Sequence, residues 1–277
     1  MNPKLKIALS IVFVLAVAFF VARAFWPKPS PVHKAPAKAV AKKIAPVKKE
    51  ALPSPVPGPA EMAIILDDWG QNASLVDDAI AVGRPLTLSV LPNLRHSRDI
   101  AERAYANGLG VMLHMPMQPR SNRQPAEPHT ILTTTPDGEI ARLLDEALAS
   151  VPHAEGVNNH QGSAATGDER VMRAVLSHLK KKGLFFVDSQ VIATSVGRKV
   201  ASETGIRFAA RQVFIDNTAT VEAVKQELER AARLARQRGR LIVIGHDKKL
   251  TLAAIRESVP QIEKSGVKLV LAKELVQ

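Results

Sequence analysis

From residue 61 to the last residue, short apolar runs alternate with longer amphipathic segments, and this alternation restricts the fold more than any other feature. Nearly continuous apolar runs are typical of strands buried on both faces, and a period of 3.6 residues indicates helices. The pattern predicts parallel strands covered by helices. The predicted strands are residues 62–66, 86–91, 110–113, 155–158, 183–187, 212–215, 241–245 and 267–271, and the predicted helices are residues 73–82, 97–107, 138–150, 168–182, 195–204, 219–238 and 251–264.

The number of strand–helix units agrees with one particular α/β architecture. About eight units in residues 61–277 match the size of a (β/α) barrel. We therefore expect an α/β fold in which a deformed (β/α) barrel has seven or eight mostly parallel strands. This barrel domain would occupy residues 61–277.

The basic character of the chain belongs to its first 60 residues. They contain ten Lys/Arg and one acidic residue, whereas residues 61–277 contain 28 Lys/Arg and 25 Asp/Glu and carry only +3 of the net charge of +12. The barrel segment has neither a basic stripe nor interleaved aromatic residues, so we do not expect a nucleic-acid partner. The absence of cysteine excludes disulfide and thiolate chemistry.

The N-terminal residues predict a membrane segment and a spacer. Lys4 and Lys6 precede an apolar run at residues 7–22, whose length lies between that of a signal peptide and that of a minimal transmembrane helix. We favour an uncleaved signal anchor over residues 1–26, and a secreted protein is the alternative if this segment is cleaved. Residues 27–60, with nine prolines, predict a disordered linker.

These segments give an expected location for the barrel. We expect it to be membrane-anchored on the outer side of the cytoplasmic membrane, in the periplasm of a cell that has one. The basic residues argue against this orientation, because eight Lys/Arg follow the apolar run before residue 50 and only two precede it. The charge count and the expected location therefore disagree.

Polar or ionisable residues follow seven of the eight predicted strands. The carboxyl ends of parallel strands lie on one face of the fold, and that face carries the active site in barrels of this kind. Some members have structural alternatives: Asp188 and Asp216 could each simply begin a loop, and Asn217 could cap a helix. The residues at this face are Asp67, Asp68, Pro92, Asn93, His114, Asn158, Asn159, His160, Asp188, Ser189, Asp216, Asn217, His246 and Asp247.

Histidines and an aspartate pair at one face indicate metal-dependent hydrolysis. Imidazole and carboxylate suit Zn²⁺ and similar divalent ions, and a site of two histidines and one aspartate leaves room for a water molecule. A second carboxylate can accept the water's proton, and an opposite histidine can protonate the leaving group. Asp67 and Asp68 could supply base and ligand, with side chains that point in different directions because successive strand residues alternate between faces.

Seven motifs along the barrel segment resemble those of the divergent polysaccharide deacetylases. This family is a branch of the metal-dependent carbohydrate esterases, and the resemblance implies a deformed (β/α) barrel, a divalent metal ion, which we expect to be Zn²⁺, and an acetylated glycan as substrate. The motifs are IILDDWG (64–70), LSVLPN (88–93), GVMLHMPMQP (110–119), GVNNHQGSAAT (156–166), LFFVDSQVIATSV (184–196), VFIDN (213–217) and LIVIGHD (241–247).

The resemblance implies a role for each matching residue. Asp67 would be the base, Asp68 and His114 metal ligands, and His246 the acid, with Asp188 as a further catalytic candidate. All five follow predicted strands, so the roles agree with the expected position of the active site.

The chain departs from the wider superfamily at two points. Gln118 stands four residues after His114, where the superfamily has its second ligand histidine. The resemblance to the divergent branch implies that His160 fills this coordination position from the next strand. An arginine–proline motif is also absent from that strand, which leaves the group that orients Asp67 unidentified.

Two functions follow from the sequence. The first is a metal-dependent carbohydrate deacetylase that acts on an N- or O-acetyl group of an envelope polysaccharide. The alternative is a glycan-binding or scaffold module of the cell envelope that keeps the barrel but has little or no turnover. The joint presence of Asp67, Asp68 and His246 favours the enzyme, since binding alone needs no acid–base pair.

Overall fold

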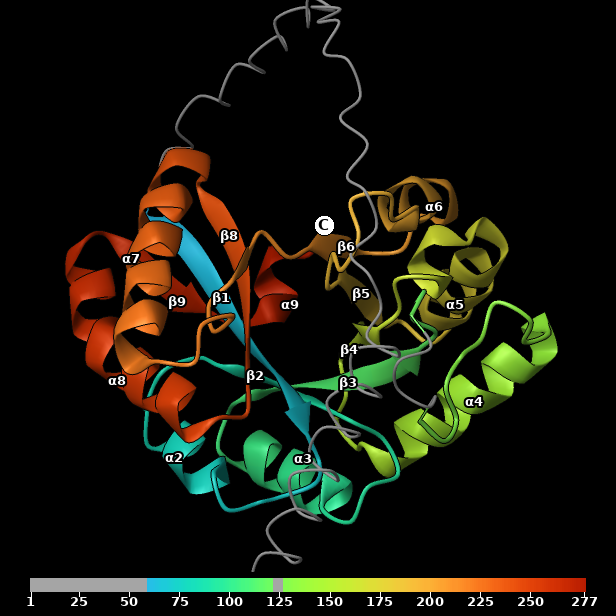
Figure 1. Ribbon diagram of the computed structural model, residues 1–277, viewed down its shortest axis with the longest axis horizontal. Coiled ribbons are helices and arrows are strands. Elements are labelled where there is room, and N and C mark those ends of the chain that lie inside the picture. Colours follow the sequence, from blue (N-terminus) through green and yellow to red (C-terminus); the bar gives the residue numbers. More distant parts are fainter. Residues whose placement is uncertain (1–58, 122–126) are drawn as a thin grey trace, which may run out of the picture. The chain divides into compact units, whose positions relative to one another are not determined.

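The apolar runs pair side by side as parallel strands, and helices cover their outer face (Figure 1). The computed structural model describes residues 59–121 and 127–277. All eight predicted strands and all seven predicted helices are present, and the structure adds the short elements β6, η1 and α9. The strands are β1 (Ala60–Trp69), β2 (Thr87–Val90), β3 (Gly110–Met117), β4 (Gly156–Gln161), β5 (Phe185–Asp188), β6 (Phe208–Ala210), β7 (Val213–Phe214), β8 (Arg240–His246) and β9 (Val267–Val270).

The helices follow the strands in the order that the sequence predicts. Several end at glycines with a positive φ, such as Gly205 after α6, where the left-handed conformation stops the helix. The helices are α2 (Val76–Ile80), α3 (Ser97–Ala106), α4 (Asp137–Ser150), η1 (Ala165–Gly167), α5 (Glu169–Lys181), α6 (Gly197–Thr204), α7 (Val221–Arg238), α8 (Lys249–Lys264) and α9 (Ala272–Leu275).

The strand order shows how the sheet curls. The order is β6-β5-β4-β3-β2-β1-β8-β7, and all of its pairings are parallel. β6 and β7 lie at opposite ends of this order, yet only Arg211 and Gln212 separate them in the chain. Residues 208–214 therefore join the two ends of the sheet, and the predicted deformed barrel of parallel strands is confirmed.

The closure at this point uses a side chain as well as the backbone. The Gln212 backbone N–H donates to Ile242 O over 3.0 Å, and its side-chain oxygen accepts from the Ile242 N–H over 2.6 Å. The Gln212 amide also donates to Ala210 O over 2.6 Å. One glutamine thus replaces strand pairing between β6 and β8 where the barrel is irregular.

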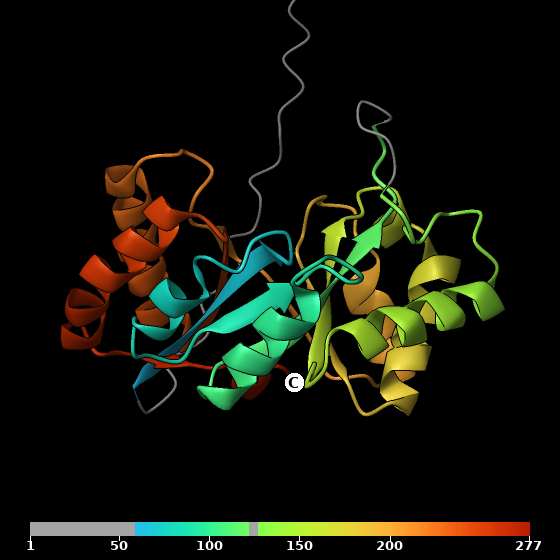
Figure 2. The same cartoon turned by 90° about the horizontal axis from the view of Figure 1, so that it is seen from below.

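β1 is the most central strand, with three neighbours. It pairs with β8 along one edge, and its other edge pairs first with β9 at residues 60–63 and then with β2 from Ile65 onward. Figure 2 shows β1 within the curled sheet, with helices to the left and right of the strands. The apolar composition of β1 fits this place, since its residues 62–66 are completely buried.

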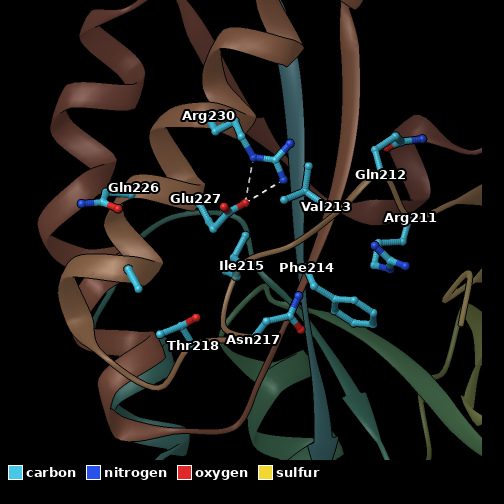
Figure 3. Close-up of a pocket in the computed structure, with 11 residues that line it drawn as sticks. Arg211, Gln212, Val213, Phe214, Ile215, Asn217, Thr218, Gln226, Glu227 and Arg230 are labelled. Atoms are coloured by element: carbon cyan, nitrogen blue, oxygen red, sulfur yellow. Dashed lines mark hydrogen bonds and ion pairs between the residues drawn. The ribbon is translucent and has the colours of Figure 1, made fainter. Parts of the chain in front are cut away.

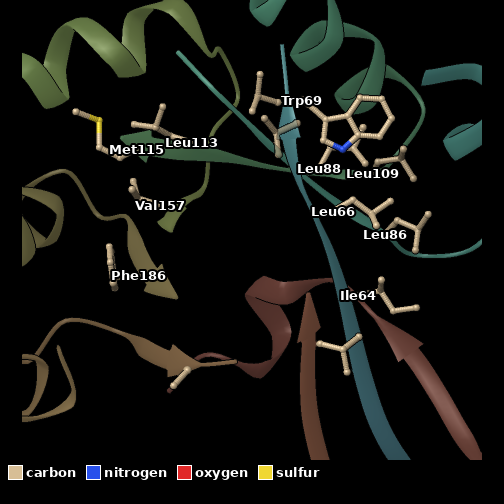
Figure 4. Close-up of a cluster of buried hydrophobic side chains, with 14 of the residues drawn as sticks. Ile64, Leu66, Trp69, Leu86, Leu88, Leu109, Leu113, Met115, Val157 and Phe186 are labelled. Carbon is tan, nitrogen blue, oxygen red and sulfur yellow. The ribbon is translucent and has the colours of Figure 1, made fainter. Parts of the chain in front are cut away.

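Alternate residues of each strand fill two separate apolar regions. One set packs between the strands and the helices, and includes Ile64, Leu66, Leu113 and Met115 (Figure 4). The other set fills the barrel interior, where α9 and the residue after it close one end. The interior set is Ala63, Ile65, Met112, Phe185, Val187, Ile242, Ile244, Val270, Ala272, Leu275 and Val276.

The predicted membrane segment is not part of this fold description. Residues 1–58, which contain the predicted signal anchor and nearly all of the predicted linker, lie outside the described residues. Within residues 59–121 and 127–277, no helix is long and apolar enough to cross a membrane.

Candidate metal centre

The interior positions of the barrel become polar at the carboxyl ends of the strands. Because side chains alternate between the two faces of a strand, a residue two places after an interior residue also faces the interior. Apolar packing therefore determines which polar residues converge. These residues are Asp67 after Ile65, His114 after Met112, Ser189 after Val187 and His246 after Ile244, together with Asn158 and His160 on β4.

Asp68 reaches the same region through an irregularity in β1. The pairing of β1 with β2 shifts between Leu66 and Trp69, so that three steps along β1 correspond to two along β2. Asp68 has a φ of 70°, a left-handed conformation that aspartate tolerates better than most residues. The expectation that Asp67 and Asp68 point in different directions is therefore wrong, because this bulge turns Asp68 towards the histidine that Asp67 also faces.

Asp68, His114 and His160 form a tight group of potential ligand atoms. His160 Nδ1 lies 3.1 Å from Asp68 Oδ1 and 3.1 Å from His114 Nε2, and His114 Nε2 lies 3.3 Å from Asp68 Oδ1. A tetrahedral ion with ligands at about 2.0–2.2 Å separates them by roughly 3.3–3.6 Å. These three residues are the predicted metal ligands, and the fold brings them together.

The electrostatics of the three residues also fit a divalent cation. Asp68 Oδ1 is buried and accepts no hydrogen bond of ordinary geometry, so it is an acceptor without a donor. Burial by itself would raise the pKa of Asp68, but the adjacent His114 and His160 hold it far below its usual range. Burial would lower the pKa of His114, yet Asp67 and Asp68 raise it to about 9. The site is thus anionic enough to attract positive charge.

Asn158 organises the residues around the ligands. Its Nδ2 donates to Asp67 Oδ1 over 2.9 Å, so its Oδ1 faces His114 Nδ1 at 2.8 Å. An amide oxygen only accepts, so His114 Nδ1 carries a proton and donates this hydrogen bond. Ser89 Oγ donates to the same oxygen over 2.5 Å. Because Asn158 holds the proton on Nδ1, Nε2 is the nitrogen that can give up its proton and direct a lone pair at Asp68 and His160, as a metal ligand requires.

Asp67 has the environment of a general base. The residue is buried, and burial raises the pKa of its carboxyl above the usual value, although His114 and the Asn158 hydrogen bond act in the opposite direction. Its Oδ2 lies 3.7 Å from His114 Nε2, which places it beside the ligand group. Asn158 fixes the orientation that the absent arginine–proline motif left without an explanation.

His246 stands opposite Asp67 with a carboxylate behind it. Asp67 and His246 are register partners on the adjacent strands β1 and β8. Asp216 Oδ1 lies 2.8 Å from His246 Nδ1, while its Oδ2 accepts from the His246 backbone N–H and the Thr251 hydroxyl. Burial opposes protonation of His246, but Asp216 raises its pKa above the ordinary value.

Asp216, the hydrogen-bond partner of His246, has a lowered pKa. Burial would raise the pKa of Asp216, yet the bond to His246 and neighbouring donors lower it to about 2. Asp216 therefore remains ionised at neutral pH and stabilises the imidazolium. The sequence placed Asp216 at this face but left open whether it only begins a loop, and the structure shows its contact with His246.

Gln118 does not take part in the ligand group. Its Oε1 accepts from the Thr133 backbone N–H over 2.6 Å and from the Thr133 hydroxyl over 2.9 Å. This contact fixes the segment after β3. The other ring nitrogen of His160 lies 3.2 Å from Glu127 Oε1, a second neighbour that the sequence pattern did not predict.

Asp188 lies outside the cluster of catalytic candidates. Phe185 and Val187 fill the interior. Because side chains alternate between the two faces of a strand, the side chain of Asp188 points outward. Its Oδ1 accepts from the Gln190 N–H over 2.7 Å and its Oδ2 from the Ser195 hydroxyl over 2.5 Å. Both oxygens serve the loop after β5, which favours the loop interpretation that the sequence left open.

Asn158 and Asp247 are rim residues to which the sequence assigned no role. Asn158 stands two residues before His160 on the same strand, and this spacing is the signal that could have placed it in the interior. Burial and the nearby Asp68 raise the pKa of Asp247 to about 7. Asp247 therefore adds a second titrating carboxyl near the ligand group.

Comparison with known sequences gives matches over the barrel. The sequence model of a family described as divergent polysaccharide deacetylase matches residues 64–276. The uncharacterized protein YibQ of Escherichia coli is 34% identical over 209 residues, which cover 76% of this chain and 65% of that protein. An uncharacterized protein of Haemophilus influenzae is 33% identical over 199 residues, which cover 71% of this chain and 70% of that protein.

Comparison with solved structures gives the same fold. The crystal structure of an uncharacterized protein from Agrobacterium tumefaciens superposes with a TM-score of 0.75 at 22% identity. The match covers 82% of this chain and 93% of that chain. At this level of identity the similarity establishes a shared fold and leaves activity to be argued from the site.

Proposed function

The chain belongs to the divergent polysaccharide deacetylase family, and from this premise we propose that it is a metal-dependent hydrolase that removes acetyl groups from an envelope glycan. The family match confirms the resemblance that the motifs predicted. Membership supports a carbohydrate deacetylase type of hydrolase with a glycan substrate. The metal, the reaction and the identity of the glycan are the parts that we propose.

One observation carries the proposal. Three potential ligand atoms lie within 3.1–3.3 Å of one another beside a buried carboxylate that is not one of them. A purely structural cluster does not need a separate base such as Asp67. It also does not need a histidine such as His246, whose Nδ1 is paired with Asp216. The arrangement supports hydrolysis because it provides ligand, base and acid as distinct groups.

Asp68, His114 and His160 would hold the ion. A divalent cation bound there supplies Lewis acidity, which polarises an acetyl carbonyl and lowers the pKa of a bound water. His114 is prepared for this role by Asn158, which keeps its proton on Nδ1. We propose Zn²⁺ as the ion, since two imidazoles and one carboxylate are typical ligands of catalytic zinc.

The remaining residues would transfer protons. Asp67 accepts one proton from the attacking water, whose oxygen forms a bond to the acetyl carbon. The protonated His246 donates a proton to the leaving nitrogen or oxygen as its bond to that carbon breaks. The products are acetate and a free amine or hydroxyl, and Asp67 and His246 return to their starting states by exchange with solvent.

The proposed substrate also suggests a location. A glycan of the envelope is reached from the outer side of the cytoplasmic membrane, and the predicted signal anchor and linker over residues 1–60 would hold the barrel there. We therefore propose a membrane-anchored protein whose barrel faces the periplasm.

Acetate release tests the proposed function. Purified protein with added Zn²⁺ should release acetate from acetylated glycan fragments, and a chelator should stop the reaction until metal is restored. His114→Ala should abolish release, whereas His153→Ala, which removes a histidine that contacts Tyr105 and Glu102 of α3, should not. Glycan binding by wild-type protein without any acetate release would favour the binding-module alternative.

A further inference from the structure

A pocket of about 360 Å³ lies between β7 and the first turns of α7 (Figure 3). Binding sites for small molecules are typically clefts of about 300–1,000 Å³. None of the residues with a predicted catalytic or ligand role lines this pocket, and Asn217 is the residue of the predicted strand-end face that does. The lining includes Arg211, Phe214, Asn217, Thr218, Gln226 and Arg230.

The lining offers hydrogen-bonding groups over an apolar floor. Val213 and Ile215 are buried beneath the pocket, and Asn217, Thr218 and Gln226 are exposed at its walls. Within the part of the chain that the structure describes, the side chains of these three polar residues make no hydrogen bond. Two amides and a hydroxyl are therefore able to bind a ligand without first losing an internal partner.

The charged side chains of the pocket already have hydrogen-bond partners. Arg230 donates to Glu227 Oε2 from two nitrogens, over 2.9 and 2.7 Å. Arg211 donates to the carbonyl oxygens of Ser189 and Gln190 over 2.7 and 2.8 Å. An anionic ligand would need a cation that is free of such partners, so the lining suits a neutral molecule rich in hydroxyl groups.

A single aromatic ring connects the pocket to the proposed acid. Phe214 lines the pocket and stacks on His246, with ring centroids 6.0 Å apart and planes inclined by 15°. The Arg211 guanidinium lies 3.7 Å from the centre of the Phe214 ring and holds it in place. Asn217 follows Asp216, the partner of His246. The Phe214 ring packs against the barrel interior, whereas Val213 and Ile215 pack on the helix side of β7, so Phe214 lies between the pocket and the proposed acid.

We propose that this pocket is a subsite for a neutral sugar residue of the glycan, other than the residue that loses its acetyl group. The choice of a sugar rests on the proposed function, whereas the existence of a site for a neutral polyol rests on the lining itself. Asn217 and Gln226 would donate and accept hydrogen bonds with the sugar hydroxyls.

Binding of N-acetylglucosamine oligosaccharides of increasing length tests the subsite. An Asp67→Asn background prevents turnover during calorimetric titration. The tetrasaccharide should bind more tightly than the monosaccharide, and Asn217→Ala/Gln226→Ala should weaken tetrasaccharide binding roughly tenfold, the scale of losing two hydrogen bonds. The monosaccharide affinity should stay unchanged. Gln261→Ala, the same substitution on the exposed face of α8, is the matched control.

The outcomes separate this proposal from the proposed function. Equal tetrasaccharide affinity in the double variant and its parent would overturn the subsite, even if acetate release is found. Tighter binding of a uronic-acid oligosaccharide, lost in Arg230→Ala, would show an anion site instead. If no acetate is released from any substrate, the proposed function fails, yet the length dependence of binding still decides the subsite because it requires no turnover.

Discussion

Asp67 and Asp68 are neighbours in the chain and differ in every physical respect that matters for catalysis. The Asp67 carboxyl is buried, receives a hydrogen bond from Asn158 and has a raised pKa. The side chain of Asp68 is 35% exposed, faces two imidazoles and has a lowered pKa. Carboxylates whose environments push their pKa values apart are suited to different roles. The bulge at Asp68 is what gives two successive residues of one strand these different environments.

Substitution of the two aspartates should separate rate from metal content. Asp67→Asn should lower kcat by roughly 10²–10⁴-fold, the usual contribution of a general base, with the bound ion retained. Asp68→Asn should lose both the ion and the activity, because it removes a ligand. Elemental analysis and acetate release would be measured on the same preparations. Equal metal content in the two variants would show that the assignment of roles is wrong.

The Asp216–His246 pair predicts the pH dependence of the reaction. His246 acts when protonated, and Asp216 raises its pKa above 6.5, so activity should persist past that pH and fall as the pH rises through the raised pKa. Asp216→Asn removes the stabilising charge and lowers this pKa. The alkaline limb of kcat/KM should therefore move to lower pH by about one unit or more. An alkaline limb at the same pH in this variant would exclude His246 as the titrating acid.

At the residue scale, part of the site followed from the sequence and part did not. His114 and His246 could be predicted because each lies two residues after an inward-facing apolar residue, and His160 lies two residues after the inward-facing Asn158. The same alternation excludes Asp188 from the interior, but the exact phase of β5 depends on its packing. The turn of Asp68 depends on a bulge with a φ of 70°, and no local signal in the sequence marks a bulge of this kind.

At the scale of secondary structure, β4 and β5 pack closely because Gly156 of β4 has no side chain. A Cβ on Gly156 of β4 would lie 2.2 Å from Cε2 of Phe185, the ring that fills the interior beside it. The glycine is therefore required by packing, since its φ is not in the left-handed region. The packing of the barrel interior below the metal centre therefore depends on the contact between Gly156 and Phe185.

Gly156→Ala should destabilise the barrel by about 1–3 kcal/mol, the usual cost of overpacking a core. The free energy of unfolding would be measured by denaturant titration. Gly138→Ala is the matched control, because no atom lies within 4 Å of a Cβ placed at Gly138 of α4. Combining Gly156→Ala with Phe185→Leu should recover part of the loss. Equal stability of the two alanine variants would contradict the packing argument.

The elements that the sequence missed are all short, and the two-residue strand β7 was predicted only because it lies in the apolar run at residues 212–215. β6 has three residues and α9 has four, too few for a recognisable period. Both also depend on partners far away in the chain: β6 pairs with β5, and α9 packs its apolar residues into the barrel interior. Their formation is a consequence of closing the barrel, which local sequence patterns do not report.

At the scale of the whole molecule, the barrel has two unlike ends. Apolar residues of α9 close one end, and the aspartates and histidines gather at the other, where the strands finish. The interior between them is apolar, so the polar groups are confined to one layer. This separation explains how buried, unpaired ligand atoms are tolerated, because the apolar layers below supply the stability.

The proposed location of this molecule is testable in cells. Protease added to spheroplasts should cut the predicted linker at residues 27–60 and release the barrel, since we propose that both lie outside the cytoplasmic membrane. Immunoblotting would follow the barrel, and a cytoplasmic marker protein would control for lysis. Protection of the linker until the cells are lysed would support the orientation that the charge count favours.

The metal content of purified protein tests the central claim most directly, and His160 is the residue on which to test it. Wild-type protein should bind close to one Zn²⁺ per chain, measured by elemental analysis after dialysis. His160→Ala should lose at least the 10–100-fold in affinity that changes around a metal site typically cost, and more because it removes a ligand, while its circular dichroism spectrum stays that of the folded protein. His153→Ala should keep its metal. Full occupancy in His160→Ala, or no metal in the wild type under any condition, would contradict a centre built from Asp68, His114 and His160.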